Sequence, residues 1–349
     1  PSGKPNSKPS YLQATTLKKV LRQSVNAEQA TSKASSYSSA QKPKITYEEK
    51  TQLDMNVLIA GGSGLIGSAL TTTLRSRGDK VTGVSRSPSS DEVAWNEITP
   101  ELMEDFDAVI NLAGESIAGR WTKAKKKRIL ESRVDTTSAI ALAIADSKNP
   151  PQCLIQASAA GFYGNRGDEI LNESSATGEG FLAEVCRQWE AAASPAEEAG
   201  TRLVMPRFGI VLADGPGALG RLVLVTKLLI GGPLGSGRQW WSWVSLNDAV
   251  RSLLFLLDHE LSGPVNIATP NPETQKKFAT TLGNVLRRPA VIPAPGFAIR
   301  MALGEMGTHL LLDSTRLNPE TLVDEGFEFE DPHLQEALRK ILDIGASSN

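Results

Sequence analysis

The feature that most constrains the fold is an apolar strand that runs directly into a glycine-rich turn. Residues 55–60 (MNVLIA) form a continuous apolar run, typical of a strand buried on both faces of a parallel sheet. Gly61, Gly64 and Gly67 follow at once, and a helical pattern continues to about residue 77. Strand, glycine-rich turn and helix in this order predict the first unit of a dinucleotide-binding α/β sheet.

Each glycine of this turn has its own expected role. Gly61 permits the tight turn out of the strand, and Gly64 leaves room for a pyrophosphate to approach the backbone at the positive end of the helix. Gly67 lets the helix pack closely on the strand. The other residues of the turn that we expect to contact the cofactor are Ser63, Leu65 and Ile66.

The end of the second strand indicates which dinucleotide is bound. Residues 80–85 (KVTGVS) form that strand, and the residues around its end are Ser85, Arg86 and Ser87, with no acidic residue before Asp91. An acidic side chain at this place grips the ribose of NAD, whereas an Arg accommodates the extra phosphate of NADP. The sequence therefore predicts NADP(H), with Ser85 and Arg86 at the phosphate; the alternative is a surface Arg at a strand end.

Further along the chain, strands and helices alternate. Strand patterns cover 106–112 and 152–158, with a helix predicted over 123–146 between them. This alternation predicts an α/β fold with a doubly wound parallel sheet, a Rossmann fold, and a smaller α-rich C-terminal substrate lobe. We place the cofactor-binding domain at 53–290 and a small helical domain at 291–349.

The most apolar stretches, residues 222–230 and 252–257, are too short to span a membrane and are expected to form buried helices. Trp240, Trp241 and Trp243 lie close together, and their alternation with Ser242 favours a short strand packed on a core over a ligand-stacking cluster. A helix capped by Ser245 or Asn247 is expected to follow them.

The first 52 residues have a different composition from the rest. Residues 1–50 hold nine Lys and Arg against three Asp and Glu, which leaves 28 basic and 36 acidic residues in the remainder. An acidic body argues against nucleic acid as the main partner. The Ser- and Lys-rich arm is typical of an organelle transit peptide, with a plastid favoured over a mitochondrion. The alternatives are a retained arm that docks on a large organellar complex and a solvated tail.

The cysteines and histidines do not indicate a metal site. Two cysteines, Cys153 and Cys186, provide neither a disulfide framework nor a ligand pattern. The three histidines are scattered and lack ligand spacing. We expect no bound metal.

Several sequence runs resemble the atypical, extended branch of the short-chain dehydrogenases/reductases, whose members are known as epimerase family proteins (short-chain dehydrogenase family 39U member 1-like). The resemblance covers about residues 55–343. The runs that carry it in the main domain are NLAGESIAGRW (111–121), SRV (132–134), ASAAGFYG (157–164) and RFGIVL (207–212). A small domain appended to that branch is similar to LGEM (303–306), RLNP (316–319) and GFEF (326–329). The resemblance implies that Asn111, Leu112, Ala113 and Gly114 line the adenine and ribose.

The same resemblance shows where the catalytic pattern fails. Members that are active use a Tyr and, four residues on, a Lys that lowers the Tyr pKa, while a Ser holds the substrate oxygen. Ser158 matches that Ser and is expected to border the cofactor as well. In the next helix Leu182 and Cys186 stand where the Tyr and Lys would be, and neither replaces a phenol–ammonium pair. The standard proton transfer is therefore expected to be absent.

Other residues are candidates to replace the missing acid. Tyr163 follows the strand that carries Ser158, and its possible roles are catalytic acid, cofactor packing near the nicotinamide, or loop packing. Glu115 and Arg120 are expected either to face the cleft or to be surface charges. Arg207 borders the substrate site or forms a structural ion pair.

Two functions remain open from the sequence. One is a cofactor-binding accessory or scaffold subunit in an organelle, a pseudoenzyme. The other is an NADPH-dependent oxidoreductase or epimerase that acts on a small carbonyl or sugar-nucleotide substrate with a non-standard acid. Because one fold serves many activities, the choice depends on the site itself.

Overall fold

The structure of this protein is a computed structural model that describes residues 54–215 and 217–344. The described residues belong to one compact unit. The expected N-terminal arm, residues 1–52, lies outside the described residues.

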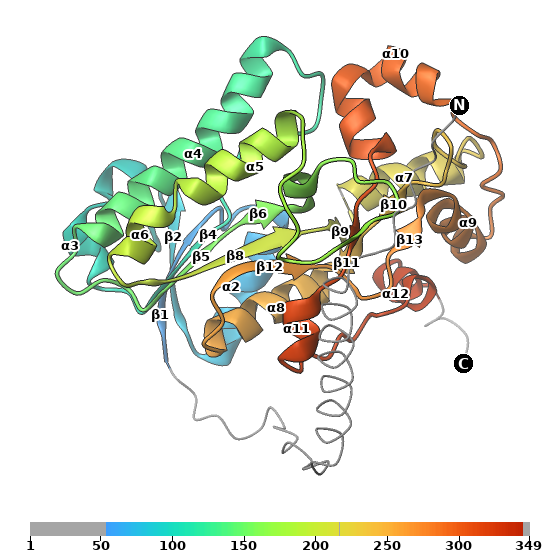
Figure 1. Ribbon diagram of the computed structural model, residues 1–349. Helices are drawn as coiled ribbons and strands as arrows, with labels where there is room; N and C mark the ends of the chain where they lie inside the picture. Colours follow the sequence, from blue (N-terminus) through green and yellow to red (C-terminus); the bar gives the residue numbers. More distant parts are fainter. Residues whose placement is uncertain (1–53, 216, 345–349) are drawn as a thin grey trace, which may run out of the picture. The chain divides into compact units, whose positions relative to one another are not determined.

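A parallel sheet of eight strands forms the centre of this unit (Figure 1). Its order is β12-β8-β5-β4-β1-β2-β3, with β6 beside β8. Strand order reverses between β1 and β4, which leaves a crevice at their carboxyl ends where such sheets bind ligands. This topology confirms the predicted Rossmann fold. The strands are β1 Asn56–Ala60, β2 Lys80–Ser85, β3 Glu92–Ala94, β4 Ala108–Asn111, β5 Cys153–Gln156, β6 Ser158–Ala159, β8 Arg202–Phe208 and β12 Gly263–Ile267.

Helices cover both faces of the sheet (Figure 1). Strand β1 is apolar from Val57 to Ala60 because it is buried on both sides: Val57 and Ile59 join one core cluster, and Leu58 and Ala60 join the other. The helices of the first face are α2 Leu65–Arg77, α8 Leu246–Asp258 and α11 Glu320–Asp324, and those of the second are α3 Pro100–Met103, α4 Lys123–Ala145, α5 Phe181–Ala191 and α6 Ser194–Glu198.

A smaller, mainly helical lobe lies beyond the carboxyl end of strand β8 (Figure 1). Trp241, Trp243 and Phe278 are at its core, so the Trp cluster packs structurally, as predicted. The helices of this part are α7 Ala218–Lys227, α9 Gln275–Leu286, α10 Gly296–Gly307 and α12 Leu334–Ile341. Short strands pair as β9 Ile210–Leu212 with β11 Trp243–Ser245, β10 Trp240–Trp241 with β13 Glu273–Thr274, and β7 Ile170–Leu171 with β14 Arg316–Leu317. The short helical turns of the chain are η1 Trp95–Glu97, η2 Ala160–Tyr163 and η3 Thr308–Leu312.

Of the two apolar stretches expected to form buried helices, one differs from expectation. Residues 252–257 lie in the buried part of α8, which Ser245 caps by accepting a hydrogen bond from the Asp248 amide at 3.1 Å. The prediction for 222–230 was wrong: α7 ends at Lys227, and Leu224 and Ile230 are 58% and 60% exposed. The apolar residues there exceed what one face of a short helix buries. No helix in the described part is long and apolar enough to cross a membrane.

Candidate cofactor site

The turn between β1 and α2 packs against the turn that follows β4. Gly61 has a φ of +84°, and a Cβ there would lie 2.6 Å from the Leu112 carbonyl carbon. At Gly67 a Cβ would lie 2.2 Å from the Gly61 carbonyl oxygen. Because neither position has room for a side chain, both glycines are needed to bring the two turns and α2 together.

The N-terminal end of α2 faces outward with no protein group closing it. Gly64 is its N-cap, no side chain caps the helix, and its first turn contains no acidic residue. A Cβ at Gly64 would meet only the Gly61 carbonyl oxygen, at 3.3 Å. The neighbouring Ser63 and Leu65 are exposed and Ile66 is half-buried. An open, positive helix end at the crevice of the sheet is the arrangement that receives a phosphate.

The end of β2 carries a positive charge that forms no ion pair with the described residues. Arg86 is exposed and makes no hydrogen bond or ion pair with the described residues. The Ser85 hydroxyl accepts from the Ser87 amide at 3.2 Å. Asp91, the nearest acidic residue along the chain, lies 3.5 Å from Arg75 instead. Arg86 is thus available to an anion that lies beside β2.

The turn after β4 is held by the buried side chain of Asn111. Its amide donates to Thr137 Oγ1 at 3.1 Å and Gln156 Oε1 at 2.9 Å, and its Oδ1 accepts from the Ala113 amide at 3.1 Å. The side chain is therefore fully engaged inside the protein and shapes the turn. Backbone at Leu112, Ala113 and Gly114 lies next to the β1–α2 turn, where a cofactor contact remains a prediction.

Glu115 extends this turn into a group of basic residues. Its carboxylate lies 2.6 Å from Lys125 Nζ and 3.8 Å from Arg128. The hydrogen bond from Lys125 and the nearby charges of Lys125, Arg128 and Arg86 lower the pKa of Glu115. Glu115 is therefore an ionised partner of basic side chains; Arg120, further along the loop, is exposed.

Ser158 lies in a buried polar chain that crosses three adjacent strands. Its hydroxyl donates to Glu190 Oε1 at 2.5 Å, and the Glu190 carboxylate pairs with Arg207 through two hydrogen bonds of 2.8 Å. The side chains of Arg207 and Glu190 are only 5% and 11% exposed. Of the two alternatives for Arg207, the structure shows the ion pair.

Tyr163 lies at the other end of this chain and does not face an open cleft. Its side chain is fully buried, and its hydroxyl accepts from Arg207 at 2.9 Å and donates to Asn266 Oδ1 at 2.7 Å. Burial raises the pKa of Tyr163, which the nearby Arg207 opposes only in part. The expectation that Tyr163 faces the nicotinamide is corrected: the strands β8 and β12 hold its hydroxyl inside the protein.

Helix α5 carries apolar side chains at the two positions that align with the catalytic Tyr and Lys of active family members. Leu182 and Cys186 pack on η2, since a Cβ at Gly161 would lie 3.2 Å from Leu182 Cβ and 3.6 Å from Cys186 Sγ. Burial raises the pKa of the Cys186 thiol to about 12. Neither side chain exchanges a proton with a substrate near neutral pH.

Sequence reasoning missed Arg133, which lies between the β4 turn and α5. Its Nη1 donates to the carbonyl oxygens of Glu115 and Ile129, both at 3.0 Å, and its guanidinium lies 4.9 Å from the centroid of the Trp189 ring. A Cβ at Gly114 would lie 3.0 Å from it. Glu190 and Asn266 were missed as well. The run SRV drew attention to residue 133, but no local pattern shows that a residue of α4 reaches α5.

Aromatic side chains pack around the N-terminal end of α5. Trp121 packs edge-on against Phe181 at 5.2 Å and stacks on His309 at 5.9 Å. His309 Nδ1 lies 2.7 Å from Asp313 Oδ2, and its Cε1 would be 3.8 Å from a Cβ at Gly180. No set of three His, Cys, Asp or Glu among the described residues could hold a metal ion.

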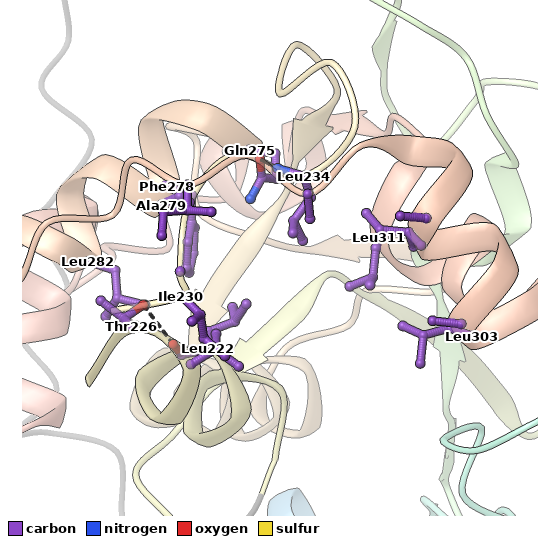
Figure 2. A pocket seen from close by; sticks show the side chains of 18 residues that line it. Leu222, Thr226, Ile230, Leu234, Gln275, Phe278, Ala279, Leu282, Leu303 and Leu311 are labelled. Atoms are coloured by element: carbon purple, nitrogen blue, oxygen red, sulfur yellow. Dashed lines mark hydrogen bonds between the residues drawn. The ribbon is translucent and has the colours of Figure 1, made fainter. Parts of the chain in front are cut away.

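A separate cavity of about 370 Å³ lies in the smaller lobe, between α7, α9, α10 and η3 (Figure 2). Its walls are aliphatic apart from a few residues such as Thr226 and Gln275. Thr226 Oγ1 donates to the Leu222 carbonyl oxygen at 2.7 Å, and Gln275 Oε1 accepts from the Leu234 amide at 2.7 Å. With these polar groups engaged, the cavity does not resemble a nucleotide site.

Comparison with known proteins agrees with this geometry. The family model for the NAD dependent epimerase/dehydratase family matches residues 57–268, and a domain of unknown function, DUF1731, matches residues 294–341. Epimerase family protein Mb2239 of Mycobacterium bovis is 42% identical over 290 residues, which cover 81% of this chain and 96% of that protein. Epimerase family protein SDR39U1 of Bos taurus is 35% identical over 294 residues, 82% of this chain and 100% of the relative.

A crystal structure of human epimerase family protein SDR39U1 (isoform 2) with NADPH superposes with a TM-score of 0.79 at 34% identity, covering 83% of this chain and 99% of that chain. UDP-glucose 4-epimerase of Thermotoga maritima, at 17% identity and a TM-score of 0.68, shares the fold. The glycine turn, the strand order and the appended C-terminal segment are therefore those of a known group: this chain belongs to the NAD dependent epimerase/dehydratase family and is an SDR39U1-like epimerase family protein.

Proposed function

We propose that this chain binds NADP(H) at the carboxyl ends of β1, β2 and β4 and does not carry out the proton transfer of a Tyr–Lys pair. The open N-terminal end of α2 at Gly64 would hold the pyrophosphate, and Arg86 with Ser85 would hold the 2′-phosphate. The turn over residues 112–114 would line the ribose. When bound, NADPH supplies a hydride, and the chain's own residues bind and orient it.

The observation that carries the proposal is an intact cofactor cradle beside an apolar α5 surface. Gly61 and Gly67 leave no room for a side chain, so the backbone of the β1–α2 turn packs directly on the turn after β4 and on α2. On α5, Leu182 and buried Cys186 stand at the positions that align with the Tyr and Lys of active family members. The NADPH in the crystal structure of human SDR39U1 supports the same cofactor for this chain.

We propose further that the protein acts as a cofactor-binding accessory or scaffold subunit in an organelle, with a plastid favoured. The basic arm seen in the sequence supports this role, because a basic segment suits docking on an acidic surface. If the full chain migrates alone in native extracts of the organelle, the subunit role is wrong.

The cofactor proposal is tested by calorimetric titration of the full chain with NADPH, NADP⁺ and NADH. We expect NADPH and NADP⁺ to bind more tightly than NADH, and Arg86→Ala to weaken NADPH binding by about 1–3 kcal/mol, the value of a charge-assisted phosphate contact. NADH affinity should not change in that variant. No binding of any of the three, or an unchanged NADPH affinity in Arg86→Ala, contradicts the proposal.

The second candidate function is an NADPH-dependent oxidoreductase or epimerase of a small carbonyl or sugar-nucleotide substrate. The pairing of His309 with Asp313 beside the start of α5 favours it, because an oriented imidazole is a competent acid. A panel of such substrates with NADPH distinguishes the two functions. Turnover that His309→Gln or Ser158→Ala abolishes, while NADPH binding remains, would establish the enzyme; no turnover across the panel favours the binding protein.

A further inference from the structure

Arg133 is a half-buried cation that forms no ion pair with the described residues. No Asp or Glu of the described chain lies within ion-pair distance of its guanidinium, since Glu115 pairs with Lys125, although the charge of Glu115 acts on Arg133 from further away. Only Nη1 donates hydrogen bonds to the protein, which leaves Nε and Nη2 free of protein acceptors among the described residues. Because a partly desolvated charge is costly when its donors are unsatisfied, this guanidinium points to a ligand.

Arg133 lies between the turn after β4 and helix α5. One side of the guanidinium touches Gly114 in the turn after β4, and another side lies over Trp189 of α5. The charge of Arg133 also acts on the Cys186 thiol, which stays protonated because burial dominates. Cys186 stands where the Lys of the standard pair is expected, so the cation of Arg133 approaches the same region from α4.

We propose that Arg133 supplies, from α4, the positive charge and hydrogen-bond donors for the ribose on the nicotinamide side of the bound cofactor. This inference rests on the proposed NADP(H) site and adds a residue to it. Arg86 would hold the 2′-phosphate at one end of the cofactor, and Arg133 would hold the far ribose at the other.

Arg133 also fixes the backbone of the turn after β4, and this second role needs a control. Ser132, its neighbour, accepts the Glu115 amide at 2.9 Å, while Arg133 donates to the Glu115 carbonyl oxygen at 3.0 Å. Ser132→Ala therefore loosens the same turn residue without removing the guanidinium. A purely structural Arg133 predicts the same effect for both variants.

The test compares three ligands that share the adenosine 2′-phosphate by calorimetry on the full chain. NADPH carries the complete cofactor, 2′-phospho-ADP-ribose lacks only the nicotinamide, and adenosine 2′-phosphate 5′-diphosphate lacks the far ribose as well but keeps both phosphates of the pyrophosphate. We expect Arg133→Met to weaken NADPH and 2′-phospho-ADP-ribose on the order of tenfold to a hundredfold and to leave adenosine 2′-phosphate 5′-diphosphate unchanged. Arg133→Lys, which keeps the charge without the planar fork, should recover part of that loss.

The outcomes separate this inference from the proposal it rests on. If the unmodified chain binds none of the three ligands, the cofactor site itself is wrong. If it binds them but Arg133→Met weakens all three equally, weakens NADPH alone, or changes nothing, the assignment of Arg133 to the far ribose is overturned. An equal, ligand-selective loss in Ser132→Ala also overturns it. Arg133→Lys with no recovery of affinity would show that the cation is not the property required.

Discussion

Removing Arg207 should destabilise the protein far more than removing Arg207 and Glu190 together. The two side chains form a pair with two hydrogen bonds of 2.8 Å, and almost none of either is exposed. Burial opposes the charge of Arg207, but the hydrogen bonds and charge of Glu190 outweigh it and raise the Arg207 pKa. In Arg207→Met the Glu190 carboxylate stays buried with only the Ser158 hydroxyl as a donor.

Breaking a buried ion pair by removing one partner costs about 3–5 kcal/mol, whereas replacing both partners is often close to neutral. For a protein of this size we expect the melting temperature of Arg207→Met to fall by roughly 6–10 °C. Glu190→Gln should show a similar loss, because it leaves the Arg207 cation buried. The double variant should lose less free energy of unfolding than either single variant, which requires a coupling energy of more than about 3 kcal/mol.

Guanidinium unfolding of the full chain, followed by tryptophan fluorescence and circular dichroism, gives the four free energies of the double-mutant cycle. Met has an apolar side chain that keeps contact with Phe162, whose ring centroid lies 3.5 Å from the Arg207 guanidinium. Losses that simply add in the double variant would refute the reasoning, since they would mean that the two side chains contribute independently.

Two further predictions concern packing and pH. Gly67→Ala should lower the free energy of unfolding by about 3 kcal/mol and abolish NADPH binding, because its Cβ would lie 2.2 Å from the Gly61 carbonyl oxygen. Gly62→Ala, whose Cβ would make only ordinary contacts at 3.7 Å and 3.9 Å, is the control for the added methyl group in urea unfolding. Burial raises the pKa of Cys186 to about 12 and of Cys153 to about 11, from 9.0 when solvated. Because the thiol form is favoured in the fold, the free energy of unfolding should decrease as pH rises from about 9 towards 11, and the double Cys→Ala variant should show a smaller decrease if measured over the same range.

The glycine turn between β1 and α2 was predicted from the sequence because it depends on local backbone chemistry. Gly61 and Gly67 lie six residues apart, and the apolar run before them specifies a strand buried on both faces. The cap of α8 was predicted for the same reason, because Ser is a preferred N-cap residue and Ser245 accepts a hydrogen bond from an amide only three residues on. Such features need only the chain's own neighbours, so a single sequence reveals them.

The contacts of Tyr163 and Arg133 could not be predicted in the same way. Tyr163 has the same sequence context whether its hydroxyl faces the cleft or turns to Arg207 and Asn266, which are 44 and 103 residues away. Arg133 reaches the α5 surface only because α4 and α5 pack side by side. Pairings over such separations come from the topology of the sheet, and no spacing along the chain encodes them.

The glycine turn and the α5 surface also differ in which substitutions they tolerate. A side chain at Gly61 or Gly67 would push the backbone apart, so the cradle for the phosphates cannot be lost without damage to the fold. Leu182 and Cys186 only fill space against Gly161, and other side chains can fill that space. A Lys at position 186 would place a second cation near Arg133, but the carboxylates of Glu190, which acts on position 186, and of Glu115, which acts on Arg133, would offset part of the repulsion. The α5 surface is therefore the part of the site where a substitution is easier to accommodate than at the glycine turn.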